Sequence, residues 1–172
     1  AAPRTFDDPL TDILRQRGLE HERRYVETLR AGGSSVVDLR EYYNDRDEHI
    51  ARTSEAMRSG TDVIVQGALR EGRWFGLPDI LRRVSLPSSL GAWSYEVIDT
   101  KLSRETEAGT ILQLGLYSAM LTEVQGVAPD RFFVVTPYGD EDYRLNDFAA
   151  YFRLIRRQML GIVELDHRKV AA

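Results

Sequence analysis

The sequence contains no cysteine, only two lysines and no long apolar run. The absence of cysteine excludes disulfide bonds, thiolate zinc sites and cysteine-bound iron-sulfur clusters, and it is typical of proteins in a reducing cytoplasm. No apolar stretch approaches the roughly 20 residues that a membrane-spanning helix needs, and the N-terminal residues lack the basic and apolar regions of a signal peptide. We therefore expect a cytoplasmic protein with no membrane partner and no iron-sulfur cluster.

Length and composition fit a single folded domain over residues 1–172. The chain is 42% hydrophobic and has eight tyrosines, six phenylalanines and two tryptophans, enough to bury a core without crosslinks. It begins with alanine rather than methionine. We expect it to be a segment of a larger protein.

Lysine is so scarce that the position of each one is informative. Arginine occupies 21 of the 23 basic positions, whereas Lys101 follows Asp99 by two residues in the apolar run Tyr95-Glu96-Val97-Ile98-Asp99-Thr100-Lys101. A compact, titratable ammonium can do chemistry that a guanidinium cannot. The run therefore predicts a strand in which Lys101 has a chemical role.

A second acid, Asp79, lies in another apolar, strand-like stretch, Gly76–Val84. Side chains at positions i and i+2 of a strand share a face, so Asp99 and Lys101 should point the same way and Thr100 the opposite way. If the two strands are neighbours, Asp79 joins them. Two carboxylates with a lysine suit metal-assisted phosphodiester hydrolysis, because carboxylate oxygens bind Mg²⁺ and the ammonium orients the attacking water. Taken alone, Asp-x-Lys is also compatible with a solvated ion pair.

Two further motifs flank this group. Gln113-Leu114-Gly115-Leu116-Tyr117 follows the lysine on a predicted helix, and Gly18-Leu19-Glu20-His21-Glu22 lies upstream on another. In order and spacing, residues 18 to 136 resemble the PD-(D/E)XK nuclease superfamily and, within it, the RecB-like nucleases. The first of the two motifs is similar to the Gln-x-x-x-Tyr signature of RecB-like domains, and the second to the helix that carries a metal-binding histidine in many of them.

The resemblance implies a metal site. One or two Mg²⁺ or Mn²⁺ ions would be held by Asp79, Asp99 and the carbonyl of Thr100, with His21 or Glu22 completing the shell. A lone histidine in a charged helix is also often simply solvated, so the choice between these two residues stays open.

The resemblance also implies roles around the metal. Lys101 would position the nucleophile, Gln113 would orient Lys101 or the metal site, and Tyr117 would contact a backbone phosphate. Gln113 and Tyr117 lie on one helix face, where they are equally compatible with a polar stripe beside the core. Glu96 belongs to the opposite strand face from Asp99, so we expect its substitution to be much milder.

The implied function is that of a metal-dependent deoxyribonuclease, an exonuclease in DNA repair or recombination. Its partners would be single-stranded DNA or duplex ends and a helicase domain or subunit, since the chain has no phosphate-binding Gly-x-x-x-x-Gly-Lys-Ser/Thr loop of its own. Two alternatives stay open: a catalytically inactive nucleic-acid-binding domain, and a structure-selective or RNA-directed endonuclease.

The net charge of −4 is unusual for a partner of nucleic acid, which normally meets a basic surface. Metal-bound carboxylates account for part of this charge. We expect Arg82 and Arg83 to contact the substrate, within a set of nearby arginines that also includes Arg70, Arg73 and Arg104.

Apolar spacing and turn residues predict the order of elements. Helices are expected at about 10–29 with a possible break at Gly18, 48–58, 105–124 and 146–160 with Asn146 as N-cap. Extended segments are expected at 36–39, 63–69, 74–84, 93–102 and 131–136; the second and third would form a hairpin around a four-residue loop, with a bend at Pro78, and residues 138–142 would form a turn. This order predicts an α/β three-layer sandwich with a mixed central sheet of about four to five strands, restriction-endonuclease-like if the resemblance holds.

Overall fold

The computed structural model describes the backbone of residues 9–104 and 106–170 and the side chains of residues 10–104 and 106–159. Its chain order is α1 (Pro9–Ala31), β1 (Val36–Asp38), the 3₁₀ turn η1 (Arg40–Tyr42), α2 (Arg46–Arg58), β2 (Val63–Val65), β3 (Leu69–Glu71), β4 (Trp74–Gly76), β5 (Ile80–Val84), β6 (Ser94–Thr100), α3 (Ala108–Gln125), β7 (Arg131–Thr136), β8 (Gly139–Arg144) and α4 (Leu145–Val170). The predicted α/β class is confirmed.

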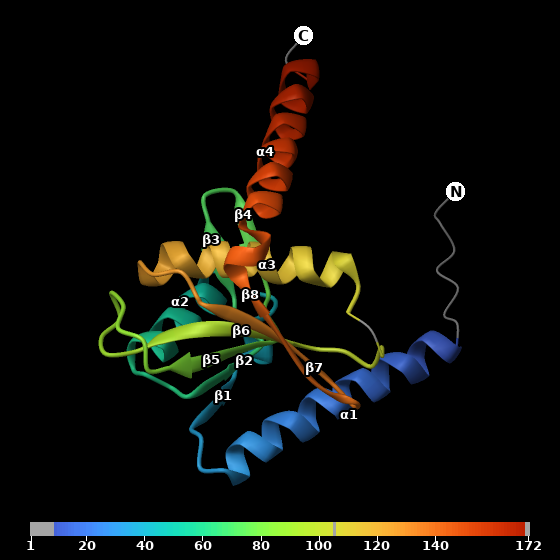
Figure 1. Ribbon diagram of the computed structural model, residues 1–172, viewed down its shortest axis with the longest axis vertical. Helices are drawn as coiled ribbons and strands as arrows, with labels where there is room; N and C mark the ends of the chain where they lie inside the picture. The colour runs from blue at the N-terminus through green and yellow to red at the C-terminus, as the bar shows by residue number, and fades with distance from the viewer. Residues whose placement is uncertain (1–8, 105, 171–172) are drawn as a thin grey trace.

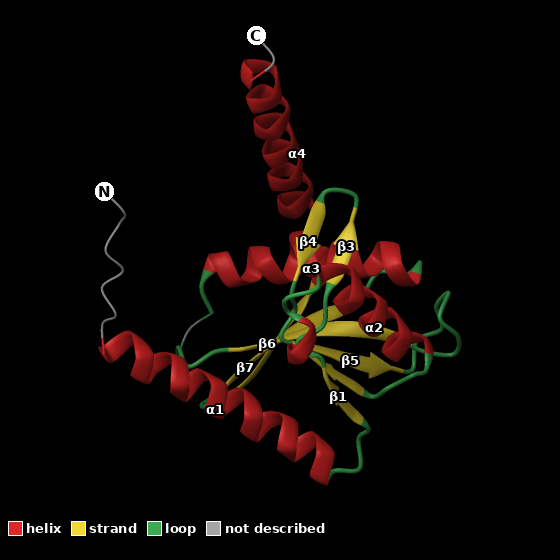
Figure 2. Cartoon of the chain, turned by 180° about the vertical axis from the view of Figure 1, so that it is seen from behind, coloured by secondary structure: helices red, strands yellow, loops and turns green. Residues whose placement is uncertain are grey.

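Six strands form the central sheet in the order β1-β2-β5-β6-β7-β8, and β3 pairs with β4 in a separate two-stranded sheet. The pairs β1–β2 and β6–β7 are parallel and the other pairs are antiparallel, so the sheet is mixed as predicted. Helix α1 covers one face of the sheet, and α2 and α3 cover the other (Figures 1 and 2). The arrangement is compatible with a three-layer sandwich.

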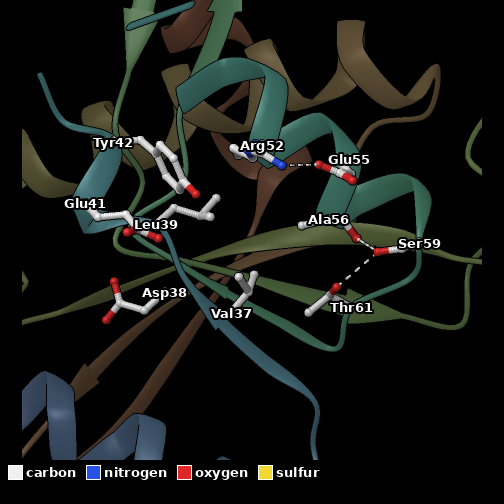
Figure 3. Close-up of a pocket in the computed structure, with 10 residues that line it drawn as sticks. All are labelled: Val37, Asp38, Leu39, Glu41, Tyr42, Arg52, Glu55, Ala56, Ser59 and Thr61. Carbon is white, nitrogen blue, oxygen red and sulfur yellow. Dashed lines mark hydrogen bonds and ion pairs between the residues drawn. The ribbon is translucent and has the colours of Figure 1, made fainter. Parts of the chain in front are cut away.

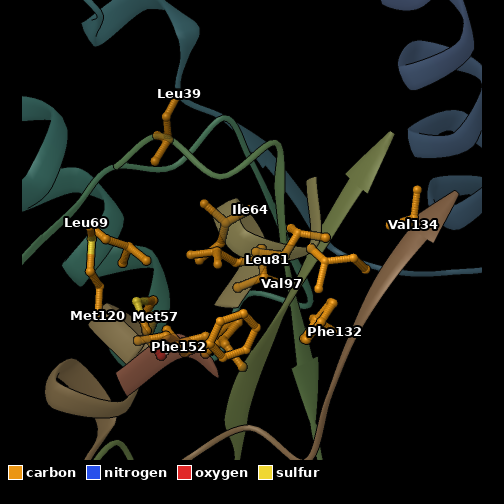
Figure 4. Packing of buried hydrophobic residues seen from close by; sticks show 14 residues of the cluster. Leu39, Met57, Ile64, Leu69, Leu81, Val97, Met120, Phe132, Val134 and Phe152 are labelled. Carbon is orange, nitrogen blue, oxygen red and sulfur yellow. Dashed lines mark hydrogen bonds between the residues drawn. The ribbon is translucent and has the colours of Figure 1, made fainter. Parts of the chain in front are cut away.

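Two hydrophobic clusters join these layers. The larger one packs the sheet against α2, α3 and the start of α4, through buried side chains that include Met57, Leu81, Leu121 and Phe132 (Figure 4). The smaller one lies between the sheet and α1, and includes Val26 and Ile98. The alternation of strand side chains thus assigns odd and even positions of β6 to different layers. Asp99 shares its side with Val97, and Glu96 shares its side with Ile98.

The sheet has six strands rather than four to five, because the segment expected to be a turn is largely strand β8. Residues 137 and 138 make the turn, and Gly139–Arg144 pairs antiparallel with β7 along its whole length. The prediction was wrong because β8 is an edge strand rich in charge, which blunts an exposed edge but removes the apolar alternation that marks a strand.

The expected hairpin strands are each divided in two. Gln66 has φ +52° and turns the chain out of the central sheet after β2, and Pro78 separates β4 from β5. The bend expected before Asp79 is confirmed, since proline cannot donate to a strand ladder. The turn between β3 and β4 consists of Gly72 and Arg73 rather than four residues.

Helix boundaries also differ from the expectation. Helix α1 continues through Gly18, since an isolated glycine weakens a helix by only about 1 kcal/mol. Helix α2 begins two residues early, with the side chain of Asp45 accepting from the backbone N–H of Glu48. Helix α4 begins at Leu145, so Asn146 lies inside its first turn, and the helix runs on to Val170. Glu105, the expected start of α3, lies outside the described residues.

Helix α3 ends at Gln125, and its C-cap residue Gly126 is in the left-handed conformation with φ +73°. Helix α4 packs its first turns on α3 and then extends away from the sheet (Figure 1). No helix within the described residues combines the length and apolar character that crossing a membrane requires.

Candidate active site

Asp79 and Asp99 come together because β5 and β6 are antiparallel neighbours. The register aligns Ile80 with Ile98, and Asp79 directly precedes β5, so the two aspartates lie close enough for the charge of Asp79 to act on Asp99. Oδ2 of Asp79 accepts the backbone N–H of Thr100 at 3.1 Å, and the Thr100 hydroxyl lies 3.5 Å from the same oxygen. These contacts fix Asp79 at the carboxyl end of β6.

Asp99 is 3% exposed, and its Oδ2 has no hydrogen-bond partner. The Nζ of Lys101 lies 3.0 Å from that oxygen and forms an ion pair with it. Burial, reinforced by the charge of Asp79 and only partly offset by Lys101, raises the pKa of Asp99 to about 7. A buried carboxylate held close to a second carboxylate is a place where a cation stabilises the charged form.

Lys101 follows the last residue of β6, and its backbone N–H donates to the carbonyl of Val135 at 3.0 Å. Its side chain is 37% exposed, so the ammonium is accessible from solvent. Burial works against the charged form, but the carboxylates of Asp99 and Asp79 outweigh it and raise the pKa of Lys101 above its usual value. Lys101 is therefore a fixed cation beside the two acids.

Glu22 reaches this group from α1. Its side chain is buried, Oε2 accepts from Nε2 of Gln66 at 3.0 Å, and Oε1 pairs with Arg40. Burial and the charge of Asp79 raise the pKa of Glu22. Through Gln66, whose Nε2 also lies 3.4 Å from Oδ1 of Asp79, the third carboxylate is linked to the first.

His21 lies beside the same region but makes a different contact. Its Nε2 is 3.0 Å from the carbonyl oxygen of Val135, which also accepts the backbone N–H of Lys101. If Nε2 donates, Nδ1 is the ring nitrogen left to bind a cation, an arrangement common among metal-binding histidines. The structure thus directs Glu22 toward Asp79 and anchors His21 to the end of β7.

Gln113 and Tyr117 share a face of α3, as their spacing predicts. Nε2 of Gln113 donates to the Tyr117 hydroxyl at 2.7 Å. The Tyr117 ring covers Gly76, where a Cβ would lie 2.6 Å from Cε1 of the ring. The Tyr117 hydroxyl is close enough to Lys101 to influence the pKa of the lysine. Helix α3 therefore places Tyr117 beside the cluster formed by Asp79, Asp99 and Lys101.

The nearby arginines do not form one patch. Arg82 binds Glu96 and stacks over Phe133 on the α1 side of the sheet, about 10 Å along the strand from Asp79 at 3.3 Å per residue. Arg83 pairs with Asp62 at 2.5 Å. The structure does not bring either predicted substrate contact to Asp99.

The other arginines of this set have separate surroundings. Arg70 pairs with Asp47 at 3.0 Å, and Arg73 lies exposed in the β3–β4 turn. Arg104, in the segment after Lys101, lies 5.0 Å from the ring centroid of exposed Tyr138. Arg104 lies three residues after Lys101 along the chain.

The chemistry of the donor set suits a hard divalent cation. Asp79 and Asp99 offer two adjacent carboxylates, and Mg²⁺ is typically bound by one or two carboxylates with water in its remaining positions. Within the described part of the chain, no three or more His, Cys, Asp or Glu side chains are grouped so that they could hold a metal ion, so neither His21 nor Glu22 is placed as a third side-chain ligand beside the two aspartates. The buried Oδ2 of Asp99, with no hydrogen-bond partner, is the observation that fits a cation best.

Sequence reasoning did not single out three residues of this group, Gln66, Tyr43 and Arg40. Gln66 is the informative case, because it is a polar side chain directly after the apolar run Val63-Ile64-Val65. Its position at the end of a buried strand was a signal in the sequence. Tyr43 and Arg40 lie in a polar segment and had no such signal.

A cavity of about 340 Å³ lies elsewhere, between β1, η1 and α2 (Figure 3). Its wall includes Asp38, Glu41 and Glu55, and its basic member, Arg52, is held by Glu48 and Glu55. The residues that line this cavity do not include Asp79, Asp99, Lys101 or Glu22, so the cavity and the candidate site are separate features.

Comparisons with models of protein families and with curated protein sequences found no match to this chain.

Proposed function

We propose that this chain is a divalent-cation-dependent nuclease that hydrolyses phosphodiester bonds in DNA. The observation that carries the proposal is the buried Oδ2 of Asp99, which lacks a hydrogen-bond partner and lies 3.0 Å from the Nζ of Lys101. A fold that merely used these residues for stability would be expected to satisfy a buried carboxylate oxygen with hydrogen bonds. An acid kept in this state is suited to binding a cation.

Asp79 and Asp99 are the residues that would hold Mg²⁺ or Mn²⁺, together with the Thr100 carbonyl and His21 or Glu22. When bound, the cation supplies Lewis acidity, which lowers the pKa of water and offsets charge on the phosphate. The contact of Thr100 N–H with Asp79 holds one carboxylate in place. The ion pair with Lys101 holds the other.

Lys101 acts as the fixed positive charge of the site. Its elevated pKa keeps the ammonium protonated at neutral pH, so it orients the attacking water and stabilises negative charge as the phosphorus–oxygen bond breaks. The water oxygen forms the new bond to phosphorus and releases a proton to solvent, and the leaving oxygen takes up a proton from solvent. Tyr117, hydrogen-bonded to Gln113, would contact a phosphate of the bound strand.

The order of motifs supports the same proposal. Asp79, Asp99 and Lys101 lie together at the ends of β5 and β6, and Tyr117 on α3 is near enough to Lys101 to influence its pKa. Gln113 is hydrogen-bonded to Tyr117. This proximity of residues from separate motifs supports the proposal.

The test is cleavage of end-labelled single-stranded DNA, duplex DNA and RNA with Mn²⁺, Mg²⁺ or EDTA. Asp99→Asn is compared with Glu96→Gln, because both replace an acid by an amide on β6 but on opposite faces. We expect metal-dependent DNA cleavage that Asp99→Asn abolishes and Glu96→Gln retains. Absence of cleavage by the unmodified chain, or equal loss in both variants, would refute the proposal, and cleavage of RNA alone would change the substrate.

A further inference from the structure

Gln66 has an unusual backbone conformation. Among the residues that the structure describes, it is the only one other than glycine with a positive φ, at +52°. Such a conformation is unfavourable for a residue with a side chain, and it persists only where the surroundings impose it. Glycine would adopt this conformation more easily. The side chain at this position must therefore have a use.

The backbone of Gln66 is held from both sides. Its N–H donates to the carbonyl of Asp79 at 2.6 Å, and its carbonyl oxygen lies 2.7 Å from Nε2 of His49. His49 is 1% exposed in α2. These contacts tie the end of β2 to the start of β5 and to a buried helix side chain.

The side-chain amide of Gln66 is oriented by a hydroxyl donor at its oxygen and by carboxylate acceptors at its nitrogen. Its Oε1 accepts from the hydroxyl of Tyr43, whose ring packs against His49 with centroids 5.5 Å apart. Its Nε2 lies 3.0 Å from Oε2 of Glu22 and 3.4 Å from Oδ1 of Asp79. The two amide hydrogens thus serve two carboxylates, and a flipped amide would turn its oxygen toward both acids.

We propose that Gln66 is a positioning residue that holds Asp79 in its cation-binding orientation and separates it from Glu22. The inference rests on the proposed metal-dependent function. Gln66 contacts Asp79 twice, through the backbone carbonyl and through Oδ1, whereas Thr100 holds Oδ2. Each carboxylate oxygen has two lone pairs, so these contacts leave room for a cation.

The separation of the acids matters as much as their orientation. Glu22 and Asp79 repel one another when both are charged. The Nε2 hydrogens of Gln66, which carry partial positive charge, lie between them, with Nε2 3.0 Å from Oε2 of Glu22 and 3.4 Å from Oδ1 of Asp79. Without this amide the two carboxylates lose their shared donor, and a cation would bind to a less ordered pair. Residues that orient metal ligands typically change metal affinity by about 10–100-fold.

The test measures Mn²⁺ affinity of the full chain by calorimetry, with thermal unfolding measured in EDTA. Gln66→Gly removes the amide but keeps a residue suited to positive φ. Tyr43→Phe removes only the hydroxyl that orients the amide, from a side chain at the surface. Gln125→Ala is the matched control, because Gln125 is a fully buried glutamine whose side chain binds the backbone of Tyr95 and Val127 away from the carboxylates.

We expect Gln66→Gly to weaken Mn²⁺ binding by about 10-fold or more. Tyr43→Phe should weaken it in the same direction by a smaller factor, and Gln125→Ala should lower the melting temperature with native affinity. Unchanged Mn²⁺ affinity in Gln66→Gly would overturn the positioning role. Should that variant not fold, Tyr43→Phe decides, and unchanged affinity there overturns it.

The same experiment separates the two proposals. If the unmodified chain binds no Mn²⁺, the proposed function fails and the role of Gln66 fails with it. If the unmodified chain binds Mn²⁺ and both variants bind it equally well, only the role of Gln66 is refuted.

Discussion

Lys101 places its Nζ 3.0 Å from Oδ2 of Asp99, the residue two positions before it. Asp99 lies near the end of β6 and Lys101 directly follows this strand, and the burial of Asp99 strengthens the interaction between the two side chains. The aspartate alone would be a destabilising buried charge, and the lysine offsets only part of that penalty. The pair therefore links the proposed DNA cleavage to the stability of the fold, and both can be measured.

Lys101→Met should reduce DNA cleavage by about 100-fold or more, because the charge that orients water and stabilises the phosphate is removed. Mn²⁺ binding and folding should persist, since both carboxylates remain. Single-turnover cleavage and calorimetry measure the two properties. Lys101→Arg serves as the charge-retaining comparison and should also cleave poorly, because a planar guanidinium differs in shape from an ammonium. Undiminished turnover in Lys101→Met would contradict the assignment.

Asp99→Asn should make the cation-free protein more stable at pH 8. The pKa of Asp99 is raised from 3.8 to about 7 on folding, so its contribution to stability is fully present below pH 3.8 and is lost as the pH rises toward 7. Asparagine does not titrate and escapes this loss. Melting temperatures measured in EDTA from pH 4 to 8 should show that the advantage of Asp99→Asn over the native protein increases with pH. A difference in melting temperature that stays constant over this range would argue against the raised pKa of Asp99.

Asp62→Asn should have the opposite effect on the pH dependence of stability. The backbone N–H and hydroxyl of Ser35, each at 2.8 Å, and the nearby Arg83 lower the pKa of Asp62 below 3.8. Its contribution is therefore present above pH 3.8 and is lost as the pH falls through the lowered value. In the same pH series, Asp62→Asn should have a lower melting temperature than the native protein at neutral pH. The two melting temperatures should become more similar as the pH falls below 3.8.

Tyr95→Phe should lower the free energy of unfolding by about 1 kcal/mol at neutral pH, because the fully buried hydroxyl donates to the carbonyl of Thr61 at 2.7 Å. Burial raises the pKa of Tyr95 from 10.0 to about 12, so stability that depends on the neutral phenol is full below pH 10 and is lost toward pH 12. Urea unfolding at pH 7 and pH 11 should show the cost of the substitution shrinking at the higher pH. If Tyr95→Phe lowers the free energy of unfolding equally at pH 7 and pH 11, the raised pKa of Tyr95 is contradicted.

Gly115→Ala should destabilise the contact of α3 with α4. A Cβ at position 115 would lie 2.1 Å from Cζ of Phe152, so the ring must move, at a cost of about 1–3 kcal/mol. Gly109→Ala on the same helix is the control, since a Cβ there meets nothing within 4 Å. It should stabilise the protein by about 0.5–1 kcal/mol through helix propensity. Urea unfolding of both variants checks the pair, and equal effects would contradict the packing of α4.

Local patterns in the sequence predicted the elements that are encoded by consecutive residues. The β6 strand, the α3 helix and the break at Pro78 follow from apolar spacing and from the missing N–H of proline. Strand β8 was not predicted, because its exposed, charged residues do not carry that spacing. The positive φ of Gln66, +52°, could not be predicted for a different reason, because its backbone is held by Asp79 and by His49 of helix α2, which are distant in the sequence.

The sequence by itself determined that Asp99 and Lys101 share a strand face and that Gln113 and Tyr117 share a helix face, because both relations depend only on the period of the local backbone. Only the tertiary structure decided that Asp79 lies beside Asp99, that Glu22 reaches Asp79 through Gln66, and that Arg82 binds Glu96 on the other side of the sheet. Those relations depend on strand order, register and helix packing. These are decided by the burial of the whole core, and no short stretch of sequence contains them.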